Sequence, residues 1–590
     1  MEYVECPVLD HQVHFVQCFV CPNFQSRVNR AVLCRGAPLA GSEDATAAEP
    51  KNRAEEDAQP KAARVSTEPP ARDARRGDTH STAPADTPSE PPPVRAAASG
   101  TKQDTAVRKS PPGARKEEIG ITEPKSGDFS EWYTQVVLKA ELADYAPVKG
   151  MIALRPDGYS IWESIKAALD AEFAREGVRN AFLPVLIPES LLTLEKSHFE
   201  GFNPEVFWVT HSGDTPVGDR LALRPTSETI AYSLYSKWIN SWRDLPLKLN
   251  FWNTALRAEI KSTKPFLRTS EFLWQEGHTV HATREEAAAQ VESMLEIYRH
   301  VIEEHLAIPV EFGRKSTREQ FVGSEYTLTV ESMMPDGKAL QMGTSHLLGQ
   351  NFAKPFSVKF ADKENVEQYA WQTSWGVSWR LIGALIMVHG DDRGLVLPPR
   401  VAPIQAVIVP VHSVKGDKVW LAATELVERL RHSGCRAHVD DRQNVTTGYK
   451  YGDWELRGVP LRVEMGPRDL KNGTAVLVRR DTGAKEQSGL ENIEGAIVGL
   501  LDTIQGDMLE SARRRAAGMT SAAQDYESLV SLISGGGFVR AHWCGNGKCE
   551  ETIKDETGAD IRLVDGGDGS GPCVVCSSPS VHEVLFARGY

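Results

Sequence analysis

Residues 251–276 read FWNTALRAEIKSTKPFLRTSEFLWQE, and this stretch places arginines and polar residues among apolar and aromatic ones. Two of those arginines are Arg257 and Arg268. A buried guanidinium without an anionic partner is costly, so each arginine predicts either an ion pair with a nearby Glu or a bound anion. Similar composition recurs in three other segments, LRPTSET at 223–229, QMGTSHLLGQNF at 341–352 and SWR at 378–380.

Arg257, Arg268 and Arg380 decide between these two interpretations when they are considered together. For any single arginine, an ion pair is the favoured interpretation. Three arginines beside Thr and Gln donors instead favour an anion site, because guanidinium groups match the geometry of phosphate and carboxylate. The sequence contains neither the P-loop pattern nor the dinucleotide-binding fingerprint. We therefore expect phosphate to be held by arginines on an antiparallel sheet.

The spacing of apolar residues beyond Phe129 predicts a mixed α+β domain. Apolar residues at 161, 162, 165, 169 and 173 repeat at helical spacing. Thr283 and Glu286 form a capping-box pattern ahead of a second apolar stripe. Strand-like runs follow at 321–330 and 356–360. Helices and strands that do not alternate regularly favour an antiparallel sheet.

Composition divides the chain into five parts. Residues 1–36 are a leader of unassigned role, and residues 37–126 are rich in Ala, Pro, Ser, Thr and charge. No aromatic residue occurs between Phe24 and Phe129. We expect disorder at 37–126, because such a segment cannot bury enough apolar surface to offset its ordering entropy. Folded parts are expected at 127–400, 403–505 and 506–590, and the strand-helix-strand pattern of the middle one predicts an α/β domain.

Bulk properties place few limits on function. The chain has 590 residues and a net charge of -13 at pH 7. An acidic total neither favours nor excludes RNA, since binding depends on local charge. No apolar run reaches the ~18 residues of a membrane span, and the N-terminus lacks a signal-peptide pattern. We expect a cytoplasmic protein without a membrane partner.

Cysteines gather at the two ends of the chain, apart from Cys435. Near the C-terminus, Cys544 and Cys549 precede a C-x2-C pair, Cys573 and Cys576. Four thiolates in two short pairs suit tetrahedral zinc, so the sequence predicts a zinc site there. The N-terminal set has one C-x2-C pair, and a metal is disfavoured there; its members are Cys6, Cys18, Cys21 and Cys34.

Residues 129–590 resemble the prolyl-tRNA synthetases of the archaeal and eukaryotic-cytosolic type (type 3) along nearly their whole length. The resemblance is carried by long phrases: LRPTSET at 223–229, FLRT at 266–269, EFLWQEGH at 271–278, TSH at 344–346, LGQNF at 348–352, VHGD at 388–391 and GLVLPP at 394–399. It implies a class II α+β catalytic domain on an antiparallel sheet, an α/β anticodon-binding domain and a small α+β cysteine-containing C-terminal domain. It also implies a homodimer.

The implied activity is that of a proline--tRNA ligase. Such an enzyme uses ATP and Mg²⁺ to convert L-proline to prolyl-adenylate, and then transfers proline to the 3′ end of tRNA(Pro). The implied catalytic residues are Arg257 and Arg380. The implied ATP-binding residues are Arg257, Glu259, Arg268, Thr269, Gln341, Thr344, Ser378 and Arg380. The implied proline-binding residues are Thr226, Glu228, Arg257, Phe202, Trp274, His278 and His346.

Three positions carry further expectations from the resemblance. The segment between Arg268 and Arg380 is filled by fold motifs and leaves no room for an inserted editing domain. We therefore expect mischarged alanine to be cleared by another protein, since a pocket excludes smaller analogues weakly. The carboxylate of Tyr590 is expected to reach toward the active site. Trp379 replaces a small polar residue of relatives, and it either narrows the adenosine site or points outward.

Contact with tRNA is expected from 403–505, where seven basic residues are candidates for phosphate contacts: Lys450, Arg457, Arg462, Arg468, Lys471, Arg479 and Arg480.

Two alternative functions stay open. One is another class II specificity, such as threonyl or glycyl. The other is a synthetase-like RNA-binding or regulatory protein without catalysis, which the intact arginines, Glu228 and His346 disfavour.

Overall fold

The computed structural model describes residues 3–6, 11–14, 24–28, 31–34, 120–198, 205–258, 262–565 and 570–590. The chain forms two units, residues 1–109 and 110–590. The first contains two antiparallel hairpins, β1 (Tyr3–Cys6) with β2 (His11–His14), and β3 (Phe24–Val28) with β4 (Ala31–Cys34). The predicted disorder lies outside the described residues from 37 to 119, as do Cys18, Cys21 and the side chains of Cys6 and Cys34.

The end of the segment predicted to be disordered, 120–126, packs on the second unit. Ile121 lies against its apolar core. The Lys125 ammonium donates to the carbonyls of Met387 and Gly390, both at 2.7 Å. Disorder was therefore the wrong expectation for these residues, because the core offers an apolar site and free helix-end carbonyls that composition cannot reveal.

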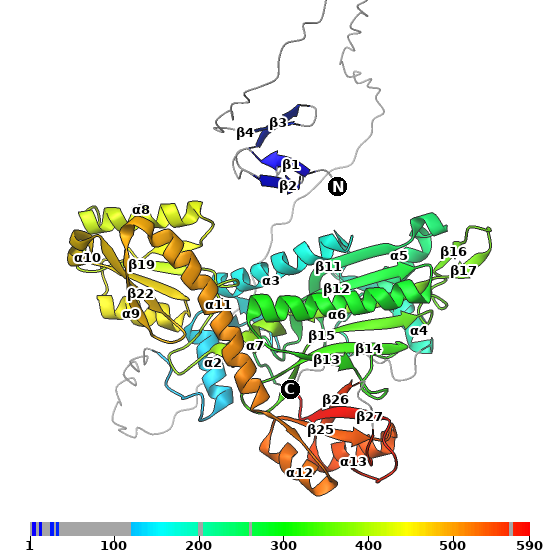
Figure 1. Ribbon diagram of the computed structural model, residues 1–590. Helices are drawn as coiled ribbons and strands as arrows, with labels where there is room; N and C mark the ends of the chain where they lie inside the picture. The colour runs from blue at the N-terminus through cyan, green and yellow to red at the C-terminus, as the bar shows by residue number, and fades with distance from the viewer. Residues whose placement is uncertain are drawn as a thin grey trace, which may run out of the picture. The chain divides into compact units, whose positions relative to one another are not determined.

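An eleven-stranded sheet forms the centre of the second unit (Figure 1). Its order is β24-β25-β27-β26-β13-β14-β15-β18-β12-β11-β7. Neighbours are antiparallel except at the ends, where β24 with β25 and β11 with β7 are parallel, which confirms the predicted antiparallel architecture. The strands from residues 127–400 are β7 (Arg179–Ala181), β11 (Leu247–Leu256), β12 (Glu271–His281), β13 (Glu311–Arg314), β14 (Tyr326–Met333), β15 (Ala339–Gly349) and β18 (Trp371–Ser378).

Two long helices, α3 (Pro156–Arg175) and α6 (Arg284–Leu306), pack on this sheet. The α6 helix starts where Thr283 accepts a hydrogen bond from the N–H of Glu286 at 3.2 Å, as the capping pattern predicts. The ring of Phe173 on α3 lies 4.9 Å from that of Trp375 on β18. The other helices of this part are α2 (Phe129–Lys139), α4 (Glu189–His198), α5 (Glu228–Trp238) and α7 (Arg380–His389).

Short strands complete this part of the fold. The run predicted as a strand at 321–330 turns at Gly323, whose φ is 86°, and β14 begins only at Tyr326. The run at 356–360 is mostly loop for a similar reason, since Ser357 has φ 54°. The remaining strands are β5 (Ala143–Tyr145), β6 (Ile152–Leu154), β8 (Leu186–Pro188), β9 (Trp208–Ser212), β10 (Thr215–Leu223), β16 (Lys359–Ala361) and β17 (Glu367–Tyr369).

The predicted α/β part has its own five-stranded sheet, ordered β20-β19-β21-β22-β23. Its strands are β19 (Ala406–Pro410), β20 (Ala437–Val439), β21 (Leu461–Met465), β22 (Thr474–Arg479) and β23 (Lys485–Gly489). Its helices are α8 (Lys418–His432), α9 (Thr447–Leu456), α10 (Pro467–Asn472) and α11 (Ile493–Ala517). Parallel pairing of β19 with β20 and β21 confirms the α/β prediction.

Most basic residues predicted to contact tRNA phosphates here are already engaged within the protein. Arg480 pairs with both oxygens of Asp391 at 2.6 and 2.8 Å. Arg457 pairs with Asp157 at 3.1 Å and also with Glu141. These pairs join the two sheet-containing parts and leave less charge on the two residues for phosphate. Three other candidates, Lys450, Arg462 and Arg479, also have internal partners, whereas Arg468 and Lys471 are exposed; contact of all seven with tRNA stays a prediction.

The C-terminal residues extend the main sheet. Strand β26 (Asp560–Asp565) pairs with β13 at Val564 and Arg314. Beyond β26 the sheet continues outward with β27 (His582–Ala587), β25 (Phe538–Trp543) and β24 (Thr520–Ala522). This region also contains the helices α12 (Tyr526–Gly535) and α13 (Gly547–Thr557). Among the described helices of the whole chain, none combines the length and apolar character that crossing a membrane requires.

Gly277 in β12 offers a test of this packing. A Cβ at this position would lie 2.1 Å from the Trp375 ring, so we expect Gly277→Ala to destabilise the fold by about 1–3 kcal/mol through overpacking. Urea denaturation followed by fluorescence measures the change. Gly495 in α11 is the matched control, because a Cβ there meets no atom within 4 Å. Gly495→Ala should be neutral or stabilising by about 0.5–1 kcal/mol; equal losses in both variants would contradict the proposed packing.

Candidate active site

One cavity of about 700 Å³ opens over the central strands of the main sheet. Every predicted ATP- or proline-binding residue within the described part of the chain lines it. These residues are Thr226, Glu228, Arg257, Arg268, Thr269, Trp274, His278, Gln341, Thr344, His346, Ser378 and Arg380. Two other predicted residues, Phe202 and Glu259, lie outside the described residues. The cavity thus unites segments that are far apart in the sequence.

Strand alternation explains why these side chains meet. On β12, Phe272, Trp274, Glu276 and His278 all line the cavity, as expected for residues two positions apart on one face of a strand. Position 277 faces the opposite side, toward Trp375. Strand β18 pairs with both β12 and β15, so the segments around Trp274, His346 and Ser378 are held as neighbours by main-chain hydrogen bonds.

The three arginines have no carboxylate partner within 4.0 Å among the described residues. Arg257 donates from Nε to the carbonyl of Pro225 at 3.3 Å. Its guanidinium lies 5.2 Å from the Phe272 ring and 5.7 Å from the Trp274 ring. Such contacts orient the group but do not neutralise its charge. The sequence left two interpretations open, ion pairs and an anion site. The absence of carboxylate partners among the described residues favours the anion site.

Arg380 begins α7 at the end of β18. Its main-chain N–H donates to the Ser378 hydroxyl at 3.3 Å. Burial, together with the positive charge of Arg257, lowers the pKa of Arg380. Repulsion between guanidinium groups is relieved when an anion binds between them. Trp379 is buried beside Phe266, with ring centroids 5.9 Å apart, and it lines the cavity without pointing outward.

An acidic cluster occupies another part of the cavity wall. One ligand atom from each of Glu228, Glu276 and His278 lies within 4.8 Å of the others. Thr226 donates to Glu228. Burial lowers the pKa of His278, but its bond to Glu276 and the charges of Glu228 and Glu276 raise it above its ordinary value. Glu228 and His278 both line the cavity, so this part of its wall can meet a positively charged group.

Glu276 is the member that sequence reasoning missed. Burial raises its pKa, but bonds from His278, Ser227 and Asn253 lower it below the usual range. The main-chain N–H of Ser227 donates to it at 3.1 Å, and the Asn253 amide donates at 2.9 Å. Its alternation with Trp274 and His278 was the available signal. Phe272 and Lys315 were missed as well, although both line the cavity.

His346 differs sharply from His278. Its Nδ1 lies 2.9 Å from the Thr327 hydroxyl, and its ring packs 4.8 Å from Phe321. Burial and the positive charges of His278 and Lys315 lower the pKa of His346 to about 3. His346 is therefore neutral at pH 7 and can serve as a hydrogen-bonding wall.

The C-terminal Tyr590 also lines the cavity. Its hydroxyl donates to Asp336 at 2.8 Å, and its main-chain N–H donates to the carbonyl of Ala339 at 3.2 Å. The tail therefore runs beside the start of β15. Tyr590 therefore lies at the cavity, while the expected approach of its carboxylate to the active site stays a prediction.

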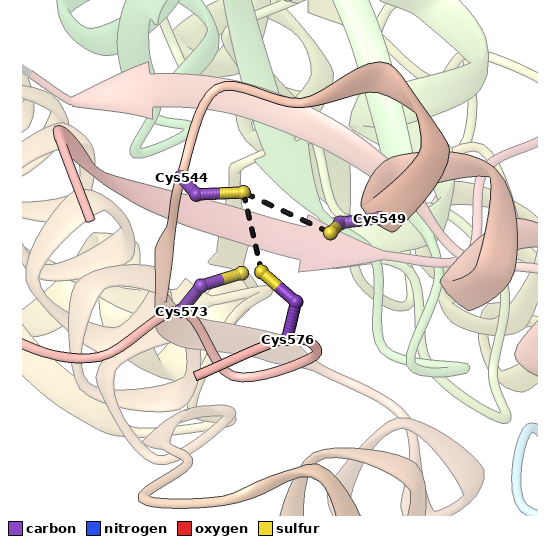
Figure 2. A group of neighbouring side chains, drawn as sticks. All are labelled: Cys544, Cys549, Cys573 and Cys576. Carbon is purple, nitrogen blue, oxygen red and sulfur yellow. Dashed lines mark hydrogen bonds between the residues drawn. The ribbon is translucent and has the colours of Figure 1, made fainter. Parts of the chain in front are cut away.

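The four C-terminal cysteines form a compact group (Figure 2). The Sγ of Cys544 lies 3.7 Å from those of Cys549 and Cys576. All four sulfur atoms lie within 4.8 Å of one another. A tetrahedral zinc with Zn–S bonds of about 2.3 Å separates its sulfurs by about 3.8 Å, so this donor set fits zinc.

The cavity can therefore hold an anion and a cation at once. Guanidinium groups suit phosphate or carboxylate oxygens. The Glu228 carboxylate suits an ammonium group, and Trp274 provides an apolar wall. A nucleotide and an amino acid together present this combination of charges.

Three protein-family models match the chain. The class II core domain of tRNA synthetases (G, H, P, S and T) matches residues 207–389. The anticodon-binding domain matches residues 405–500. The C-terminal domain of prolyl-tRNA synthetase matches residues 526–590.

Similar proteins agree with these matches. A proline--tRNA ligase of Cenarchaeum symbiosum is 65% identical over 475 residues, which cover 80% of this chain and 100% of the relative. One of Acetoanaerobium sticklandii is 50% identical and covers 78% of this chain and 96% of the relative. The crystal structure of prolyl-tRNA synthetase from Cryptosporidium parvum with halofuginone and AMPPNP superimposes with a TM-score of 0.76 at 40% identity, covering 80% of this chain and 100% of that one. The chain therefore belongs to the prolyl-tRNA synthetase family of class II aminoacyl-tRNA synthetases, which are proline--tRNA ligases.

Proposed function

We propose that this cavity activates L-proline with ATP and that the chain then transfers proline to tRNA(Pro). One observation carries the proposal. Within the described part of the chain, the same cavity contains three arginines without carboxylate partners and, on another part of its wall, the acidic cluster that includes Glu228. The crystal structure of the Cryptosporidium parvum relative contains AMPPNP, an ATP analogue, which supports nucleotide binding by this chain.

In the first step the proline carboxylate attacks the α-phosphate of ATP, and pyrophosphate leaves. A carboxylate is already nucleophilic at neutral pH, so the protein supplies position and charge neutralisation. We assign Arg257 to the α-phosphate and the proline carboxylate, and Arg268 and Arg380 to the outer phosphates. Gln341, Thr344, Ser378, Thr269 and Glu259 complete the proposed nucleotide site. Mg²⁺ would offset the remaining phosphate charge.

The imino acid is held at the other side of the cavity in this proposal. Glu228 and Thr226 receive the secondary ammonium group, which offers two N–H donors. Trp274, His278, His346 and Phe202 surround the ring, whose apolar shape needs walls more than polar partners. The bond between the Asn253 amide oxygen and the Trp274 indole N–H fixes one of these walls.

Other expectations stay predictions. We propose the division at 127–400, 403–505 and 506–590, with the middle part binding the anticodon. Dimer formation and a cytoplasmic location remain predictions from the sequence.

The activity is tested by pyrophosphate exchange with each of the twenty amino acids. Proline should support exchange best, while threonine or glycine would reveal another specificity. Arg257→Ala should reduce exchange by about 100-fold or more, because it removes charge stabilisation in the transition state. Its binding of tRNA, measured by filter retention, should change little. Unchanged turnover in this variant would reject the role given to Arg257.

We also propose that Cys544, Cys549, Cys573 and Cys576 hold zinc, which would stabilise the C-terminal region and take no part in the chemistry. Elemental analysis of the purified chain should find about one zinc per chain. Cys549→Ser should lose it and lower the thermal midpoint, because metal binding is coupled to folding. Cys435→Ser, a buried cysteine outside the group, is the control. A zinc-free chain with an unaltered midpoint after chelation would contradict the assignment.

We propose finally that the chain has no internal editing domain. Residues between Arg268 and Arg380 are occupied by strands and by α6. Alanine should be activated to a measurable extent, since each missing methylene gives a pocket only about 1–3 kcal/mol of discrimination. Incubation of alanyl-tRNA(Pro) with the chain should leave the ester intact beyond its spontaneous hydrolysis. Rapid enzyme-dependent deacylation would overturn this proposal.

A further inference from the structure

Lys315 lies on the wall of the cavity and has no part in the reaction as assigned above. Its side chain is only 4% exposed, and its Nζ lies 3.1 Å from the Oε1 of Glu331. An ammonium group has three N–H donors. Within the described part of the chain, Glu331 is the one acceptor of this ammonium. Two donors are therefore left for a ligand.

Glu331 is shared with a residue of the C-terminal region. Nε and Nη2 of Arg562, on β26, lie 3.1 and 2.7 Å from its Oε2. Burial raises the pKa of Glu331, but Lys315 and Arg562 lower it below the usual range, so the carboxylate is ionised at pH 7. The group formed by Lys315, Glu331 and Arg562, the buried triad, contains two positive charges and one negative charge.

The buried triad lies near two parts of the proposed site. The main-chain N–H of Lys315 donates to the carbonyl of Thr327 at 2.9 Å, and the Thr327 hydroxyl contacts His346 at 2.9 Å. The charges of Glu331 and Arg562 also act on Arg380. Glu319 lines the cavity too, but it forms no ion pair with Lys315 within the described contacts. The positive charge of the triad is thus unbalanced on the side that faces the cavity.

We propose that Lys315 binds a negatively charged oxygen of a substrate, and that Glu331 and Arg562 are positioning residues for it. The ligand chemistry is a carboxylate or phosphate oxygen, supplied by proline or by ATP. A bound anion balances the net charge of the triad, which is costly to bury alone. Because Arg562 lies on β26, the C-terminal region contributes to substrate affinity without touching the substrate. The inference depends on the proposed function.

Lys315→Met tests it, because this change leaves Glu331 and Arg562 as a neutral buried pair and so spares the fold. In proline-dependent pyrophosphate exchange, the KM for proline or for ATP should rise about tenfold, as for loss of a charged hydrogen bond. Which KM rises identifies the source of the oxygen. Arg562→Met should raise the same KM, and Arg562→Lys should restore it to within about threefold of wild type, since it returns the charge.

Ser316→Ala is the matched control. Ser316 follows Lys315 and donates to Glu550 at 2.6 Å, so it bridges the same two parts of the chain without lining the cavity. Its exchange kinetics should match wild type. If Lys315→Met leaves both KM values within about twofold of wild type, or changes them no more than Ser316→Ala does, the inference is overturned. Absence of proline-dependent exchange in the wild-type chain would instead overturn the proposed function.

Discussion

Three guanidinium groups converge on one cavity while two nearby carboxylates, those of Glu276 and Glu331, are engaged by other donors, and this separation of charge determines how the rest of the site is built. Glu276 is saturated by Ser227, Asn253 and His278. Glu331 is saturated by Lys315 and Arg562. If either carboxylate could turn toward Arg257 or Arg380, an internal ion pair would compete with substrate. Fixed bonds to other donors prevent that competition, which keeps the arginines available to anions.

The β-sheet supplies the rigidity that this separation requires. Strands β12, β18 and β15 are adjacent, and their registers are set by main-chain bonds that do not depend on the functional side chains. The face opposite the cavity is packed by aromatic residues, including Trp375 against Phe173. A change at the back of the sheet would therefore shift Glu276 and His278 together. Packing and chemistry are coupled through alternate positions of the same strand.

Sequence patterns predicted the residues that line the cavity better than they predicted the contacts between distant parts of the chain. Long motif phrases identified Arg257, Glu228 and His346, and strand spacing could have added Glu276. The partners of Arg457 and Arg480 could not be predicted, since Asp157 and Asp391 are distant in sequence and the pairs form only when two folded parts meet. The extension of the sheet by β26 was missed for the same reason, because edge-strand pairing depends on tertiary arrangement.

These long-range ion pairs also limit how the chain can contact RNA. In the part between 403 and 505, Arg480 is only 4% exposed and is held by Asp391, so its charge is largely cancelled before any RNA arrives. Removing one partner of such a buried pair is expensive, whereas an exposed pair contributes little. Buried Arg480, together with half-buried Arg457, therefore helps to fix the orientation of the α/β part against the catalytic part. Exposed residues such as Arg468 and Lys471, by contrast, form no ion pair among the described residues, so their positive charge is not cancelled within the protein. The same residue type thus has two distinct roles, and burial decides which of them each arginine takes.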